Sequence, residues 1–174
     1  VASVKKCVAD IASNFTTNRM LIDYEERFYD KLAARKRKLS ADSCLLAREI
    51  AAWKRKVSAA WDQVRAVDVE RVKIDKEAVC VGEKYRFSVT VDIANLRPED
   101  IGVEMVIARQ IVGGQGVNVV RTIRLERTRT DNNLVTYALD YTPDETGTFD
   151  VALRIYPCNP HLPHRMDFAL VKWA

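Results

Sequence analysis

The side chains in this sequence that most readily bind metals or transfer protons near neutral pH are its two histidines. His161 and His164 occur in the stretch NPHLPHR. Two imidazoles at this spacing can contribute to a metal site, but prolines flank both, and no acid or thiol nearby completes a recognised ligand spacing. The pattern therefore predicts a loop and no metal site.

Cysteines and carboxylates are present without the spacing that catalysis or metal binding requires. The four cysteines form no C-x-x-C pair, so we expect free thiols at Cys7, Cys44, Cys80 and Cys158. The sequence contains no glycine-rich dinucleotide loop, no P-loop and no serine elbow, and nothing marks a catalytic pair among the carboxylates. Taken by itself, the chain is expected to have no catalytic, cofactor-binding or metal-binding residues.

A basic cluster, ARKRKL at residues 34–39, could bind nucleic acid or act as a targeting signal. These cations stand where a helix is expected to end, and there they interact favourably with the helix dipole. No base-stacking aromatic residues interleave with them. We therefore expect a solvated helix end and no nucleic-acid partner.

Two tryptophans could serve as platforms for sugar rings. Trp53 and Trp61 share one apolar helix face with several aliphatic residues. A large ring in that position more often belongs to a core or an interface than to a sugar site. The aromatic residues of the predicted strands occupy the inward register, and we expect them to belong to the core as well.

The composition is that of a globular protein. Of the 174 residues 48% are hydrophobic and 30% are charged, no apolar run approaches the roughly 20 residues that span a bilayer, and no signal peptide is recognisable. These observations predict a cytoplasmic location and no membrane partner. Residues 1–66 carry 14 Lys and Arg against 8 Asp and Glu, whereas the remainder carries 14 against 16, which indicates two different parts.

The first part of the chain has the periodicity of helices. A short helix is predicted at about 3–13, and a second begins at a cap provided by Thr16 or Thr17. Ser40 is expected to cap a third, whose apolar face is formed by Leu46, Ile50, Trp53, Val57, Trp61 and Val64. The second and third helices are expected to form an antiparallel hairpin. Along the second helix, one apolar stripe recurs every four residues and is our candidate partner-contact surface: Met20, Tyr24, Phe28 and Leu32.

After Val64 the apolar period changes to two, which indicates strands. Seven strands are predicted, at about 67–74, 85–93, 101–107, 117–125, 135–141, 149–155 and 166–173. Short strands with one apolar face and well-marked turns are typical of an antiparallel immunoglobulin-like sandwich. The predicted fold is therefore α+β, with a helical segment at 1–65 and a β-sandwich at 67–174.

Several motifs resemble the C-terminal part of bacterial α-glucan (glycogen or starch) phosphorylases, in the long-chain branch that ends in a β domain. FTTNRMLIDYEERFY, residues 15–29, resembles the helix that follows the second nucleotide-binding-type domain, and AREIAAWKRKVSAAWDQVR, residues 47–65, resembles a later helix of the family. The stretches 96–104, 147–157 and 170–174 resemble strand and C-terminal motifs of the β domain. The resemblance covers nearly the whole chain.

This resemblance implies a parent enzyme that cleaves α-1,4-glucans with phosphate, releases glucose 1-phosphate and carries pyridoxal phosphate on a lysine in the motif E-A-S-G-x-x-x-M-K. The motif is absent from these residues. The chain is therefore expected to be a non-catalytic part that contacts the parent's catalytic domains, with α-glucan as the parent's substrate and a homodimer as a further possibility for the fragment.

Two alternatives stay open at this point, a carbohydrate-binding module and a protein–protein interaction domain. An exposed row of aromatics on the sandwich would favour glucan binding. An exposed apolar stripe on the helices would favour the phosphorylase interpretation, because separation from catalytic domains would uncover it.

Overall fold

The structure is a computed structural model that describes residues 2–7, 9, 11, 16–72, 80–111 and 116–174. Its contacts divide the chain into two compact units, Val1–Ala52 and Trp53–Ala174. We call them the helical unit and the β unit and describe each by itself. The class is α+β, as predicted.

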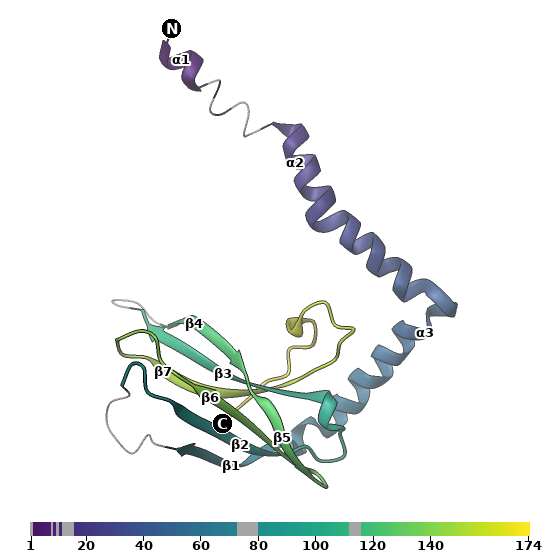
Figure 1. The fold of residues 1–174 in the computed structure, drawn as a ribbon. Coiled ribbons are helices and arrows are strands. Elements are labelled where there is room, and N and C mark those ends of the chain that lie inside the picture. The colour runs from purple at the N-terminus through teal and green to yellow at the C-terminus, as the bar shows by residue number, and fades with distance from the viewer. Residues whose placement is uncertain (1, 8, 10, 12–15, 73–79, 112–115) are drawn as a thin grey trace. The chain divides into compact units, whose positions relative to one another are not determined.

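The helical unit consists of consecutive helices (Figure 1). α1 (Ala2–Cys7) is followed by α2 (Thr17–Tyr24), one π-helical turn (Glu25–Tyr29) and α3 (Asp30–Ala60), whose last residues belong to the β unit. Thr16 caps α2 as predicted, since its Oγ1 accepts a hydrogen bond of 3.2 Å from the backbone N–H of Arg19. Several residues of the first predicted helix, between 8 and 13, lie outside the described residues.

The predicted hairpin of two helices is wrong. α3 consists of two helices joined by a kink at residues 41–44, where Ala41 has an extended backbone and Asp42, Ser43 and Cys44 have φ of 49°, 55° and 63°. Residues 41–44 include neither glycine nor proline, the residues that most often end a helix. Helical geometry resumes after Cys44. Ser40 lies immediately before this kink.

The β unit contains two four-stranded sheets in which all pairings are antiparallel. The first sheet has the order β1 (Arg65–Val72), β2 (Tyr85–Asp92), β6 (Leu134–Tyr141) and β5 (Glu126–Asp131). The second has the order β4 (Val117–Arg124), β3 (Ile101–Gln110), β7 (Asp150–Pro157) and β8 (Lys172–Trp173). Short 3-10 turns occur at Trp61–Gln63, Pro98–Asp100 and Arg165–Phe168.

Both sheets and the end of α3 contribute to one hydrophobic core. The helix supplies Trp53, Val57, Trp61 and Val64, which are 8%, 0%, 6% and 0% exposed, so the prediction that both tryptophans belong to a core or interface is confirmed. The strand aromatics Tyr85, Phe87 and Tyr137 are buried in the same core. From Trp53 onward, the apolar face predicted for residues 46–64 therefore packs into this core.

The strand predictions hold for most elements and fail for two. β5 was not predicted, because its sequence ERTRTD has no apolar alternation and every residue in it is exposed. The strand expected at 166–173 is a 3-10 turn followed by the two-residue β8. Residues 73 and 74 of the first predicted strand lie outside the described residues.

Candidate partner-contact surface

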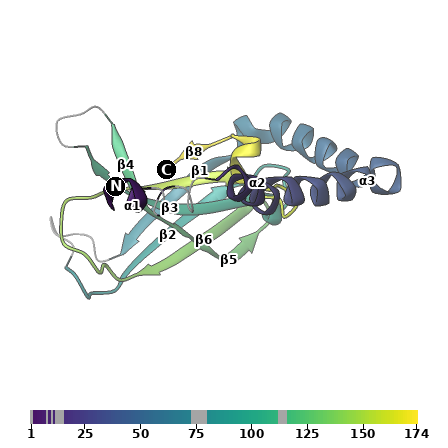
Figure 2. The ribbon, with the colours of Figure 1, turned by 90° about the horizontal axis from the view of Figure 1, so that it is seen from above.

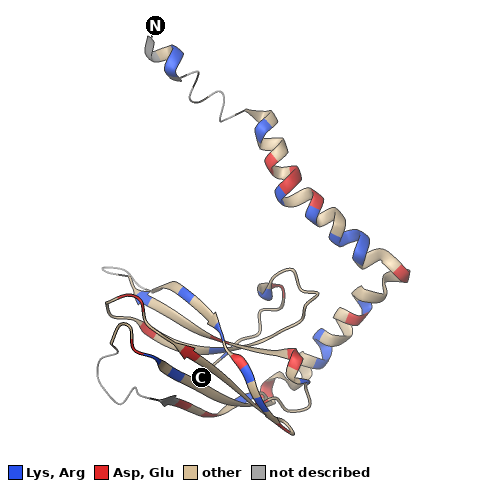
Figure 3. Cartoon of the chain, in the orientation of Figure 1, with Lys and Arg blue, Asp and Glu red and all other residues tan. Residues whose placement is uncertain are grey.

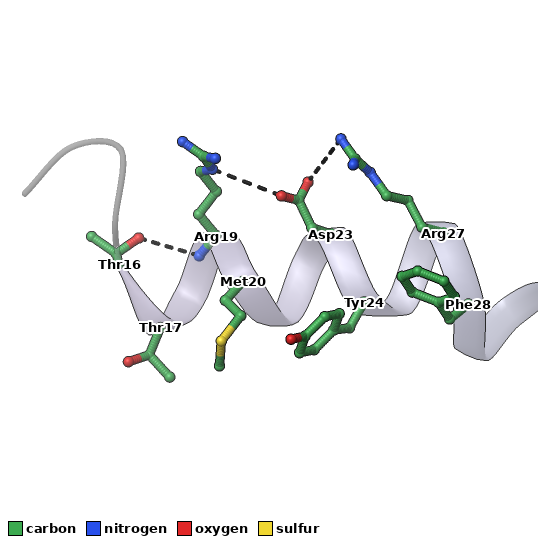
Figure 4. A pocket seen from close by; sticks show the side chains of 8 residues that line it. All are labelled: Thr16, Thr17, Arg19, Met20, Asp23, Tyr24, Arg27 and Phe28. Carbon is green, nitrogen blue, oxygen red and sulfur yellow. Dashed lines mark hydrogen bonds and ion pairs between the residues drawn. The ribbon is translucent and has the colours of Figure 1, made fainter. Parts of the chain in front are cut away.

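The predicted stripe lies on the outside of the helical unit. Met20, Tyr24, Phe28 and Leu32 are 45%, 43%, 54% and 61% exposed. The first three point to the same side of the helix in Figure 4. The rings of Tyr24 and Phe28 meet edge to face at 6.1 Å between centroids. Exposed apolar side chains in such a row are unusual on a surface without a partner.

A row of charges runs beside the stripe (Figure 4). Asp23 lies between Arg19 and Arg27, with 3.8 Å from each arginine to a carboxylate oxygen. All three side chains are well exposed, so these pairs contribute little to stability. An open groove of about 380 Å³ is lined by both rows and by the start of the helix: Thr16, Thr17, Arg19, Met20, Asp23, Tyr24, Arg27 and Phe28.

In the β unit, Asp100 is a buried carboxylate with several donors. Its Oδ1 accepts hydrogen bonds from Trp53 Nε1 at 2.9 Å and Arg97 Nη2 at 3.0 Å, and its Oδ2 accepts one from the Arg97 backbone N–H at 3.0 Å. Burial alone would raise the pKa of Asp100, but the hydrogen bonds from Arg97 and Trp53 outweigh it and hold the pKa below its ordinary value. Asp100 therefore ties α3 to the turn before β3.

Glu104, the second buried carboxylate, is 3% exposed and faces two arginines. Its Oε1 accepts a hydrogen bond of 2.6 Å from Arg154 Nε, and its Oε2 accepts one from Arg165 Nη1. Arg154 also lies over the ring of Trp173, 5.6 Å from its centroid. The charge of Glu104 is thus matched by two arginines, which suits a structural ion pair.

The histidines and cysteines form no cluster with one another among the described residues. His164 Nδ1 accepts a hydrogen bond of 3.1 Å from the Met166 backbone N–H in the 3-10 turn at its own position in the chain. Cys44 and Cys80 are exposed and Cys158 is half-buried, all three as free thiols. Within the described ranges, no three His, Cys, Asp or Glu side chains gather as a metal site would require.

The described lysines do not fit a pyridoxal phosphate site. Such a site needs a lysine whose ammonium group can be released to react with an aldehyde. Only Lys54 and Lys172 are half-buried among the described lysines, and both donate hydrogen bonds to backbone carbonyls. The described helices also include none that is long and apolar enough to cross a membrane.

The comparison with protein families decides the relationship. A family model described as the glycogen phosphorylase C-terminal domain matches residues 61–174. The chain belongs to this family. The match covers every strand of the β unit and the 3-10 turn Trp61–Gln63 that follows α3.

Curated phosphorylases match the chain from end to end. The maltodextrin phosphorylase of Thermococcus litoralis is 30% identical over 98% of the chain, and the glycogen phosphorylase of Mycobacterium tuberculosis is 26% identical over 100% of it. In both cases the chain spans only 20% of the length of the relative. This sequence therefore corresponds to the C-terminal fifth of glycogen and maltodextrin phosphorylases.

Sequence reasoning missed the polar residues that organise this phosphorylase C-terminal domain. Asp100, Glu104 and Arg154 all lie within the motifs that carry the resemblance, yet they read as ordinary charged residues in a turn or a strand. One signal was available for Glu104. It alternates with Val103 and Met105, so a charge there must lie on the outer face of β3, and only a covering segment buries it.

Proposed function

We propose that this chain is the non-catalytic C-terminal part of an α-1,4-glucan phosphorylase, an enzyme that releases glucose 1-phosphate from glucan by phosphorolysis. The observation that carries the proposal is the alignment of the whole chain with a fifth of two phosphorylases. The burial and pairing of Asp100 and Glu104 support a structural task for the β unit, because both carboxylates are already satisfied.

The partner of the helical unit is, on this proposal, the catalytic region of the parent. The stripe of Met20, Tyr24, Phe28 and Leu32 supports this assignment, because burying a large apolar side chain contributes about 2 kcal/mol and four such residues are exposed here. Arg19 and Arg27 border the stripe and would orient the contact by pairing with acceptors on the partner.

We further propose that the β unit is an immunoglobulin-like sandwich. With its strands lettered A, B, C, C′, D, E, F and G in chain order, the first sheet has the order A-B-E-D and the second C′-C-F-G. This arrangement agrees with the two sheets of the immunoglobulin architecture. The single core shared by both sheets supports the same inference.

Pyridoxal phosphate would belong to the catalytic region of the parent. When bound, it would supply phosphate-mediated proton transfer to the substrate phosphate. The residues of this chain would contribute to folding, domain packing or closure around that region. The parent is expected to act in the cytoplasm.

The structure favours this task over glucan binding by the β unit. A sugar-binding face presents aromatic rings to solvent. Among the large hydrophobic side chains exposed in the described part of the β unit, Trp173 is the one aromatic residue, and one of its faces is taken by Arg154.

The proposal is tested by assaying the purified chain beside the longer phosphorylase that contains it. We expect glucose 1-phosphate release from maltooligosaccharides and pyridoxal absorbance only in the longer protein. Reproducible release of glucose 1-phosphate by the chain alone would refute the non-catalytic assignment. An inactive longer protein, purified with its cofactor, would refute the parent reaction.

A further inference from the structure

Residues 158–174, which we call the C-terminal strap, leave β7 at Pro157 and return beside it as β8 (Figure 2). At the end of the strap, Ala174 and Leu153 exchange two backbone hydrogen bonds, of 2.9 and 3.3 Å. Near its middle, Arg165 pairs with the buried Glu104 of β3. The strap is therefore fixed to the second sheet at two separate points.

The strap also reaches the end of the helical segment. Lys172 Nζ donates hydrogen bonds to the carbonyl oxygens of Val64, at 2.6 Å, and Asp62, at 3.0 Å. These carbonyls follow the last turn of α3, where a helix has no further N–H groups to satisfy its oxygens and carries partial negative charge. An ammonium group is well suited to this position.

A second lysine makes the reverse connection from the helix to the strap. Lys54 Nζ donates a hydrogen bond of 2.7 Å to the carbonyl oxygen of Asp167 and lies 5.3 Å from the centre of the Phe168 ring. The same ring meets Trp53 edge to face at 5.4 Å. Two lysines, more than a hundred positions apart in sequence, thus join the two ends of residues 53–64 to the strap.

We propose that the C-terminal strap is a clamp that holds residues 53–64 on the sheets, with Lys172 acting as the C-terminal cap of that helix from a distant strand. Leu162, Phe168, Leu170 and Ala174 of the strap also pack against the core, so the two ammonium groups add fixed polar contacts at the ends of residues 53–64 to this apolar packing. The contacts that form the clamp all lie within the β unit. The idea that the clamp holds the helix for a catalytic partner rests on the proposed function.

The test is hydrogen exchange on the full chain carrying Lys54→Met and Lys172→Met together. Methionine keeps most of the length and removes the charge. We expect the amides of residues 53–64 to exchange at least tenfold faster, with those of β2 and β6 unchanged. Lys56→Met, an exposed lysine on the same helix, is the matched control and should change nothing.

Unchanged exchange at residues 53–64 would overturn the proposal, and so would an equal rise in β2 and β6, since the lysines would then stabilise only the whole unit. If the double variant does not fold, each single variant carries the same readout.

Lys172→Arg keeps a cationic donor and should restore most of the protection that Lys172→Met removes. A loss of protection in Lys172→Arg equal to that in Lys172→Met would contradict capping by charge. Because glucan and phosphate play no part, this test can fail while the proposed function stands.

Discussion

Asp100 and Glu104 differ in the donors that surround each carboxylate. Asp100 accepts from a backbone N–H, an indole and a guanidinium, whereas Glu104 lies between two arginines. Removing either charge therefore leaves different donors unsatisfied. Each residue gives its own prediction.

The variant Asp100→Asn should destabilise the β unit by about 1–3 kcal/mol at pH 7, because an amide cannot accept all the donors that now face the carboxylate. The folded-state pKa of Asp100 lies below its ordinary value of 3.8. Its charge therefore stabilises the fold above that value, and this contribution is lost as the pH falls through the folded-state pKa. Urea unfolding of both proteins should show a difference that shrinks below about pH 4. A difference that stays constant from pH 7 to pH 3 would contradict this account.

Glu104→Gln should cost about 3 kcal/mol of unfolding free energy, because Arg154 would keep its charge in a largely buried position without a counter-ion. The Arg154 side chain is only 18% exposed. Chemical denaturation measures the loss, and Glu126→Gln on the exposed edge strand β5 is the control, expected to change stability by less than about 0.5 kcal/mol. Equal losses of unfolding free energy in the two variants would show that the buried pair stabilises the fold no more than an exposed charge does.

At the scale of elements, the three long edge strands are each interrupted by a bulge. The unpaired residues are Val67 in β1, Val120 in β4 and Thr128 in β5. A bulge twists an edge away from further strand pairing, and β5 adds a row of charges visible in Figure 3. Val67 and Val120 at the bulges are 54% and 42% exposed.

Apolar alternation predicted β2, β3, β6 and β7 with starts within one residue, because one face of each strand packs on the core. The strand expected at 117–125 is present as β4. Alternation could not predict β5, which buries nothing. The cap expected at Ser40 lies directly before the helix break at residues 41–44, so the break was predicted although the antiparallel hairpin was wrong. The stripe from Met20 to Leu32 was readable from spacing alone. The pairing of Glu104 with Arg165 was not, since the partners are 61 positions apart.

The β-sandwich predicted at residues 67–174 omits the end of α3, and this omission leads to a prediction about stability. Trp53, Val57, Trp61 and Val64 belong to the core, and each contributes roughly 1.5–3 kcal/mol by its burial. We therefore expect residues 53–174 to unfold cooperatively and residues 67–174 to do so at a much lower denaturant midpoint. Circular dichroism of both fragments provides the comparison. Equal midpoints would mean that the helix end adds nothing to the core.

At the scale of the whole molecule, the exposed stripe should cause the isolated chain to associate. We expect a two-fold dimer through the helical unit, because stripes of the same kind can cover each other. Met20→Asp with Phe28→Asp should give a monomer in light scattering at tens of micromolar. Ala33→Asp, on the opposite side of the helix by its spacing, is the control and should leave the dimer intact. A monomeric unmodified chain would refute the dimer.

On the function proposed above, the helical unit contacts the catalytic region of a phosphorylase through Met20, Tyr24, Phe28 and Leu32. Hydrogen exchange of residues 17–32 tests it most directly, with the isolated chain at a concentration below its self-association compared with the longer phosphorylase that contains it. The account predicts fast exchange in the isolated chain and strong protection of the same amides in the longer protein, because burial of the stripe fixes the helix. Equally fast exchange in both proteins would contradict it.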